Sequence, residues 1–232
     1  MKKNRLAAAG FALAIAAGSL VAAPAFAADV YVPGDITAVE AGSYPAGWFT
    51  GSDPVAAATP TGSDAGLQIT GRTILLNGES TTITGGAHLR ALMESADIDA
   101  DGAATFQIPI FFNSTGEAKQ FATIRPTNPG TPGTTWVLSR SVEQLMGNTP
   151  YTAAEIEEAT DNMIADSDGT WVPQVLAFGV IVDEGTSVLL RSVSFDGDNY
   201  LFTKEPVVDV PTEETPDAQV PTPVVKKATF TG

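Results

Sequence analysis

The hydrophobic pattern of the chain is mostly that of β-strands. From residue 67 onward, short segments alternate apolar and polar residues and are separated by turn-forming Gly, Asn and Asp. The clearest segment is 104–112, although Pro109 within it indicates an edge strand or a bulge, because proline has no N–H to donate. Its apolar face comprises Phe106, Ile108, Ile110 and Phe112. Similar strands are expected at 67–70, 72–76, 81–84, 121–125, 134–140, 172–182, 187–195 and 200–203.

Two helices are expected between these strands. Segment 87–96 carries an apolar stripe at helical spacing, formed by Leu89, Leu92, Met93 and Ala96. The second helix begins near Thr152, which forms a capping-box pattern with Glu155. Residues 141–146 are expected to add a further short helical turn. About nine strands with two or three short connecting helices predict a mainly β domain over residues 29–204, a two-sheet, jelly-roll-like β-sandwich.

The N-terminal segment has the pattern of a secretion signal. Three positive charges in the first five residues precede an apolar run at 6–25, and Ala25-Phe26-Ala27 fits a small-x-small cleavage site before Ala28. A membrane anchor is the alternative, since about 20 apolar residues can span a bilayer. Glycine and proline interrupt the run and no positive flank follows it, so residues 1–28 are predicted to be a signal peptide and the protein to be secreted or held at the cell surface.

The composition changes again at residue 205. From there proline recurs at every fifth position up to residue 221, among Val, Thr, Glu and Asp. Proline at this density blocks helices and interior strands. Residues 205–232 are therefore predicted to be a disordered tail or stalk, which ends a released protein or leads to an anchor or another domain.

Charge and composition exclude several classes of function. The net charge of −15 becomes −18 once Lys2, Lys3 and Arg5 leave with the signal peptide. Such a chain is unsuited to binding nucleic acid or an anionic membrane surface, which both require basic patches. Cysteine is absent, which rules out disulfides, thiolate catalysis and zinc–thiolate sites.

A set of short motifs resembles a known family. In chain order they are a Trp-containing entry loop, the turn at 75–78, the strand around Phe106, Thr135-Trp136-Val137, Phe178-Gly179-Val180 and Ser194-Phe195-Asp196-Gly197. This order is similar to that of the lectin-type jelly-roll modules of secreted surface proteins from high-GC Gram-positive bacteria. The resemblance covers roughly residues 44–203. It implies a surface or glycan-related role and carries no catalytic residue across.

Catalysis finds little support in the sequence. His88 is the only histidine, and the chain has no G-x-S-x-G elbow for a serine nucleophile. The Glu-x-Asp-x-x-Glu strand of retaining lectin-like hydrolases is also missing. A glycosidase needs two carboxylates that face one cleft, and the fold alone decides whether such a pair assembles. An extracellular polysaccharide hydrolase therefore stays an alternative, and no catalytic residue is predicted.

Aromatic residues are the candidates for sugar binding. Tyr44 and Trp48 lie close together in a segment that is expected to be a loop, where their rings would stack on a sugar. The competing interpretation places Trp48 in the core, as is usual for a large aromatic side chain in a sandwich. Trp136, inside a predicted strand, is expected in the core.

One acidic motif suggests a metal. Asp97, Asp99 and Asp101 alternate and are followed by Gly102, as in the first half of a calcium loop. Ile108 stands where an EF-hand has its bidentate glutamate, so this is no EF-hand. Either the three carboxylates bind calcium, or they form a solvated acidic turn between the helix and the strand.

Taken together, these patterns predict a secreted or cell-surface, non-catalytic module for adhesion, glycan binding or surface structure. Its expected partner is an extracellular glycan or a surface protein. A polysaccharide hydrolase and a purely structural spacer remain the alternatives.

Overall fold

The computed structural model describes residues 28–32, 36–40, 42–51, 59–115, 120–128, 133, 135–168 and 170–203. Residues 1–27 of the predicted signal peptide (1–28) and the predicted tail at 205–232 lie outside these ranges, whereas Ala28 is described. Among the described residues, no helix has the length and apolar character needed to cross a membrane.

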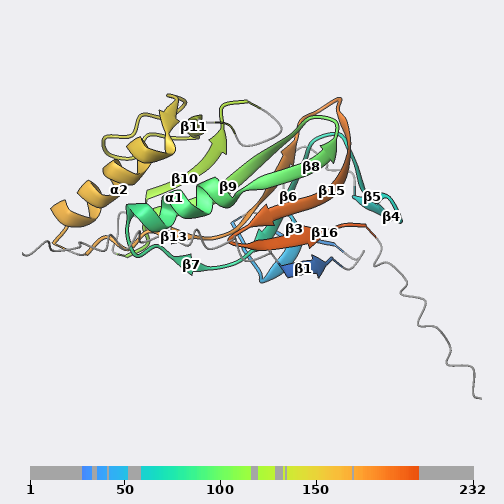
Figure 1. Cartoon of the computed structure of the whole chain (residues 1–232), viewed down its shortest axis with the longest axis horizontal. Coiled ribbons are helices and arrows are strands. Elements are labelled where there is room, and N and C mark those ends of the chain that lie inside the picture. Colours follow the sequence, from blue (N-terminus) through green and yellow to red (C-terminus); the bar gives the residue numbers. More distant parts are fainter. Residues whose placement is uncertain are drawn as a thin grey trace, which may run out of the picture.

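The described strands form two sheets (Figure 1). The smaller sheet has six strands in the order β1-β16-β15-β5-β4, with β8 also paired to β15. Its strands are β1 (Ala28–Tyr31), β4 (Thr61–Ser63), β5 (Gly66–Thr70), β8 (Asp97–Asp101), β15 (Ser187–Phe195) and β16 (Asp198–Leu201). All neighbours in it are antiparallel except β1 and β16.

The larger sheet has ten strands in the order β12-β11-β10-β9-β14-β6-β3-β2, with β13 joining β7 to β9. They are β2 (Thr37–Ala38), β3 (Gly47–Thr50), β6 (Thr73–Gly78), β7 (Thr81–Thr82), β9 (Ala104–Asn113), β10 (Gln120–Pro126), β11 (Thr135–Leu138), β12 (Tyr151–Thr152), β13 (Gln174–Val175) and β14 (Phe178–Val182). Only β2 and β3 are parallel.

The two sheets pack face to face through aromatic side chains. Phe195 of β15 stacks on Phe178 of β14 with 4.4 Å between ring centroids, and it lies 5.9 Å from Phe106 of β9. All three rings are buried, and each fully buried phenylalanine contributes about 1.5–3 kcal/mol relative to an exposed one. The prediction of a mainly β, two-sheet sandwich is confirmed.

Strand β9 is a central strand of the larger sheet. Its predicted apolar face is fully buried, in agreement with the alternation of apolar and polar residues along the strand. The expectation of an edge strand at Pro109 is wrong, because β9 pairs on both sides. On one side, however, the β14 pairing ends at Gln107 and the β13 pairing begins at Ile110, so Pro109 sits in the gap where no N–H is needed. Its carbonyl oxygen still accepts a hydrogen bond from Leu176 N at 2.9 Å.

Two helices cover the part of the larger sheet that the smaller sheet leaves open (Figure 1). They are α1 (Gly86–Ser95) and α2 (Ala153–Asp166), which pack against each other. Both bury the predicted apolar stripes: Leu89, Leu92 and Met93 in α1, and Ile156, Ala159 and Met163 in α2. The predicted helical turn at 141–146 is wrong. Val142 and Leu145 exchange two backbone hydrogen bonds of 2.8 Å, which close a tight turn with Glu143 at a φ of 47°.

Candidate functional site

Trp48 lies in strand β3, not in a loop. Its ring meets three others edge-on, with centroid distances of 5.8 Å to Phe178, 5.6 Å to Tyr200 and 4.8 Å to Phe202. Its Nε1 is buried and has no hydrogen-bond partner among the described residues. Three aromatic neighbours, all distant in sequence, thus hold Trp48 in the packing between the sheets.

Tyr44 lies on the opposite face of the larger sheet. It is half-buried against Phe49, with 6.3 Å between the ring centroids, and this burial raises the pKa of Tyr44. Phe49 directly follows Trp48 in β3, and successive strand residues point to opposite faces. The structure therefore does not bring Tyr44 and Trp48 together into one sugar platform, which corrects the expectation of a paired site.

The three aspartates of the predicted calcium loop form strand β8. This corrects the expected curled loop or turn, since β8 pairs with β15 along its whole length. Asp97, Asp99 and Asp101 are exposed on one face of the strand, where neighbouring positions are about 7 Å apart. Arg191 of β15 reaches across the ladder to two of them, with Nη1 3.0 Å from Asp99 Oδ1 and Nη2 3.9 Å from Asp101 Oδ2.

Among the described residues, no three His, Asp or Glu side chains are arranged to hold a metal ion. Extended backbone keeps the carboxylates of β8 apart, whereas one ion requires them to converge. Calcium at Asp97, Asp99 and Asp101 stays a prediction that needs β8 to rearrange locally.

Sequence reasoning missed a second acidic cluster. Glu79, just after β6, lies near Asp196 and Asp198 of the β15–β16 hairpin, and we call these three residues the hairpin carboxylates. The pKa of Glu79 is raised, mainly because the carboxyl group is partly buried and to a lesser extent because Asp196 and Asp198 repel its negative charge. Tyr200 donates a hydrogen bond of 3.4 Å to Asp198 Oδ2, and burial beside these carboxylates raises the pKa of Tyr200 to about 12. The turn itself was recognisable in the sequence, but the approach of Glu79 depends on the packing of the two sheets.

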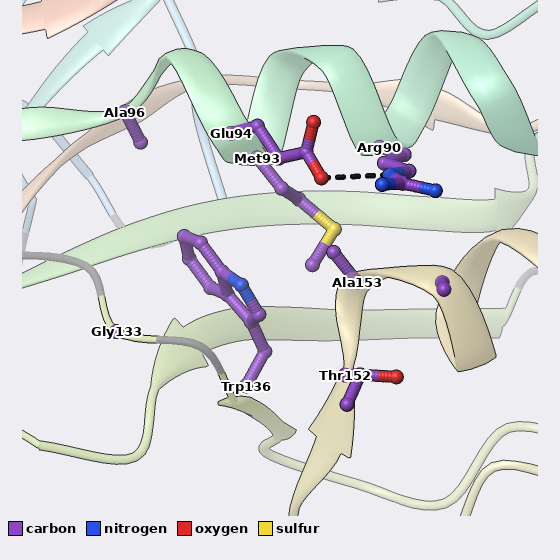
Figure 2. Close-up of a pocket in the computed structure, with 9 residues that line it drawn as sticks. Arg90, Met93, Glu94, Ala96, Gly133, Trp136, Thr152 and Ala153 are labelled. Atoms are coloured by element: carbon purple, nitrogen blue, oxygen red, sulfur yellow. Dashed lines mark hydrogen bonds and ion pairs between the residues drawn. The ribbon is translucent and has the colours of Figure 1, made fainter.

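A depression of about 370 Å³ opens between the helices (Figure 2). Trp136 of β11 forms its floor and is only 2% exposed, so its predicted place in the core is confirmed. At the rim, Arg90 of α1 bonds Glu94 at 2.6 Å and Glu157 of α2 at 3.1 Å. The cation of Arg90 is thus neutralised by two carboxylates, which suits a structural role in joining the helices.

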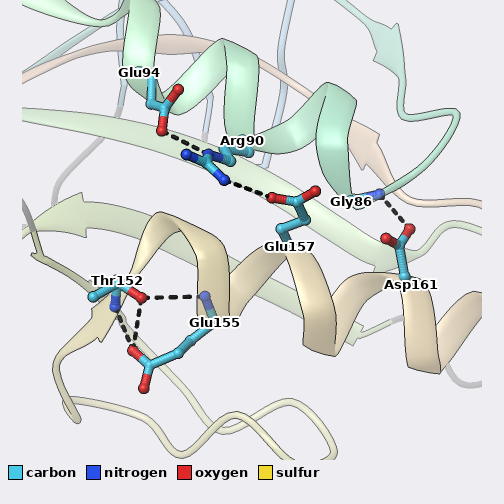
Figure 3. Close-up of polar contacts among 7 residues, drawn as sticks. All are labelled: Gly86, Arg90, Glu94, Thr152, Glu155, Glu157 and Asp161. Carbon is cyan, nitrogen blue, oxygen red and sulfur yellow. Dashed lines mark hydrogen bonds and ion pairs between the residues drawn. The ribbon is translucent and has the colours of Figure 1, made fainter.

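Polar contacts at both helix N-termini support the same structural role (Figure 3). In the capping box of α2, Thr152 Oγ1 accepts from Glu155 N at 3.2 Å and Glu155 Oε2 accepts from Thr152 N at 2.7 Å, as predicted. These hydrogen bonds hold the pKa of Glu155 below its usual range. At α1, the cap comes from the other helix, because Asp161 accepts a hydrogen bond from Gly86 N.

The outer face of the larger sheet carries a third group of residues that sequence reasoning missed. Ala122 and Ile124 of β10 point inward and are fully buried, so Phe121, Thr123 and Arg125 point outward. Two further side chains join them from neighbouring segments: the Phe111 ring lies 5.6 Å from Phe121, and the Arg140 guanidinium lies 5.7 Å from the Phe121 ring centroid. We call this set, Phe111, Phe121, Thr123, Arg125 and Arg140, the β10 stripe.

The two arginines of the β10 stripe differ from the other described cations. The described residues include five arginines and no lysine. Arg72, Arg90 and Arg191 each form an ion pair with a carboxylate, whereas Arg125 and Arg140 form none within the described part of the chain. Arg125 and Asp183 both line a hollow of about 280 Å³, but the carboxylate of Asp183 pairs with Arg72 at 3.4 Å.

The chain was compared with protein families, curated sequences and solved structures. Comparison of the chain with known proteins finds no matching family model, no matching curated sequence and no matching solved structure. The resemblance to lectin-type modules therefore stays an expectation from short motifs.

Proposed function

We propose that the protein is an extracellular, non-catalytic binding module whose β10 stripe binds an anionic polysaccharide, one that carries carboxylate or phosphate groups. The observation that carries this proposal is the pair of arginines, Arg125 and Arg140, that have no carboxylate partner within the described part of the chain. The chain has 27 acidic side chains and only 12 lysines and arginines. In such a chain, two cations on one sheet face that have no acidic partner among the described residues are available to an external anion.

The side chains of the stripe suit this kind of ligand. The planar guanidinium group matches carboxylate and phosphate oxygens with two parallel hydrogen bonds. Phe111 and Phe121 are half-buried and offer apolar ring surface beside the cations, as sugar faces require. The Phe121 ring also holds Arg140 through a cation–π contact, worth about 0.5–1 kcal/mol at exposed sites, which lowers the entropy lost on binding.

The stripe also has the shape for an extended chain. Phe121 and Arg125 are four residues apart on one strand, which corresponds to about 13 Å. Thr123 and Ser139 lie between them. The backbone N–H of Thr123 donates a hydrogen bond of 2.9 Å to the side-chain Oγ of Ser139. A polymer lying along β10 would therefore meet an aromatic and cationic end, a hydroxyl-bearing middle and a second cation.

The test is a binding panel with the wild-type mature chain. Polygalacturonate supplies carboxylates, poly(glycerol phosphate) supplies phosphates, and dextran is the neutral control. We expect binding to at least one of the two anionic polymers, with affinity that falls as salt rises, since exposed charges are screened over about 10 Å at 0.1 M salt. Equal binding to dextran would contradict the role of the arginines.

The same panel separates the two alternatives. A structural spacer would bind none of the polymers. A polysaccharide hydrolase would release new reducing ends from a polymer that it binds. Each of these results would overturn the proposed function.

A further inference from the structure

We propose that removal of the signal peptide creates an α-ammonium group at Ala28 that docks among the hairpin carboxylates and completes the fold. This inference is independent of the β10 stripe. It joins two observations: Ala28 follows the predicted cleavage site, and Ala28 is also the first residue of strand β1.

The register of β1 places Ala28 at the β15–β16 hairpin. Strand β1 runs parallel to β16, with Ala28 opposite Asp198 and Tyr31 opposite Leu201. Just beyond the strand, Val32 N donates a hydrogen bond of 2.8 Å to Leu201 O. In an extended strand, every second N–H points to the same neighbour, so the nitrogen of Ala28 also points toward β16. By the same register, the nitrogen of Ala28 faces the carbonyl oxygen of Gly197, which lies between Asp196 and Asp198 in the chain.

Four carboxylates of the described residues gather around this position. Glu79 approaches from the end of β6, and Asp196 and Asp198 lie on either side of Gly197. Asp29, next in β1, accepts a hydrogen bond from Asn199 Nδ2 at 3.0 Å. None of these four carboxylates forms an ion pair with an arginine within the described residues. A single positive charge at Ala28 would offset their mutual repulsion.

The precursor lacks this charge. While residue 27 is attached, the nitrogen of Ala28 is a neutral amide, which can pair in the sheet but carries no charge. After cleavage the nitrogen is an amine whose ordinary pKa is about 7.7–8.0, so it is mostly protonated at pH 7. Docking among carboxylates favours the protonated form and raises the pKa of this amine in the folded state. The resulting stability is fully present below about pH 7.7 and is lost as the pH rises through the higher folded-state value.

The experiment compares two forms of the mature chain, residues 28–232: one with a free α-amine and one with an acetylated α-amine. At pH 7 we expect the acetylated form to melt lower, on the order of 2–4 °C. The difference should vanish near pH 11, where the amine is neutral in both states. Equal melting temperatures at pH 7 would overturn the proposal.

Two variants test the partner of the amine. In Asp198→Asn, acetylation should lower the melting temperature by less than half as much as in wild type. In Glu184→Gln, which removes an exposed carboxylate from the β14–β15 turn, the full effect of acetylation should persist. An undiminished effect in Asp198→Asn would overturn the proposed pairing. If that variant does not fold, the pH profile of the two wild-type forms decides alone. N-terminal sequencing of the exported protein that finds a start at another residue would also overturn the proposal.

Discussion

Asp161 of α2 caps the first turn of α1, with its Oδ1 2.6 Å from Gly86 N (Figure 3). The preceding residue, Gly85, has no side chain to provide this cap. The helices approach so closely here that a Cβ on Gly86 would collide with the carbonyl oxygen of Glu157. The contact therefore depends on an acceptor in one helix and on a missing side chain in the other.

The first prediction concerns this close approach. Gly86→Ala should destabilise the domain by about 1–3 kcal/mol, because one helix must shift to accommodate the methyl group. Gly85→Ala is the matched control: its added Cβ would lie 3.5 Å from Asp161 Oδ1, an ordinary contact, and should change stability by less than about 0.5 kcal/mol. Urea unfolding followed by circular dichroism measures both. Equal losses in the two variants would contradict the proposed role of the crossing point.

A second prediction defines where the folded domain ends. Phe202 is 7% exposed and packs on Trp48, so Phe202→Ala should cost about 3 kcal/mol. A chain that ends at Lys204 keeps this contact and should melt with the full chain, since residues 205–232 are predicted to be disordered. A drop of several degrees in the shorter chain would show that the tail docks on the domain.

The third prediction tests calcium. Any ion at Asp97, Asp99 and Asp101 has to compete with Arg191 for two of the three carboxylates. Calcium at a hundredfold excess over its dissociation constant would stabilise the fold by about 2.7 kcal/mol, and Arg191→Gln should enlarge the shift in melting temperature relative to EDTA. If neither wild type nor Arg191→Gln responds to millimolar calcium, β8 is only an acidic strand.

Glu79 provides a prediction about pH. Its pKa is raised in the folded state, so the folded protein binds more protons than the unfolded chain. Stability from this group is present below its unfolded pKa of about 4.3 and is lost as the pH rises through the folded-state pKa. In the mature chain with an acetylated α-amine, which carries no positive charge at Ala28, Glu79→Gln should therefore raise the free energy of unfolding at pH 7, by less than about 1 kcal/mol because the group is partly solvated. Unfolding curves at pH 4 and pH 7 measure this, and a variant that is less stable at pH 7 would contradict it.

The sequence predicted correctly those helices and strands that are defined by residues close together in the chain. The alternation of β9 identified its buried face, and the Thr152 and Glu155 pair identified the start of α2. Strand β8 was misassigned because alternating aspartates fit both a calcium loop and the exposed face of a strand. The pairing of β8 with β15, about 90 residues away in the chain, decides between them.

The candidate sites were harder to predict for the same reason. The sequence could not decide between a ligand-binding and a core position for Trp48, because the rings that pack on it come from residues 178, 200 and 202. Nothing in the sequence near Arg125 or Arg140 indicates that these two arginines have no ion pair among the described residues, since ion pairing is set by the tertiary fold. The neighbours of these side chains therefore could not be predicted from the sequence, although many of the strands and helices could.

The most direct test of the proposed function is the affinity of the Arg125→Gln/Arg140→Gln variant for the anionic polymer that the wild type binds best. Each arginine contributes about tenfold if its contact is worth about 1.4 kcal/mol, so the dissociation constant should rise by about a hundredfold. Arg191→Gln, which removes a paired arginine from the other sheet, should leave the dissociation constant within about twofold of wild type. An unchanged dissociation constant in the double variant, or an equal loss in Arg191→Gln, would contradict binding at the β10 stripe.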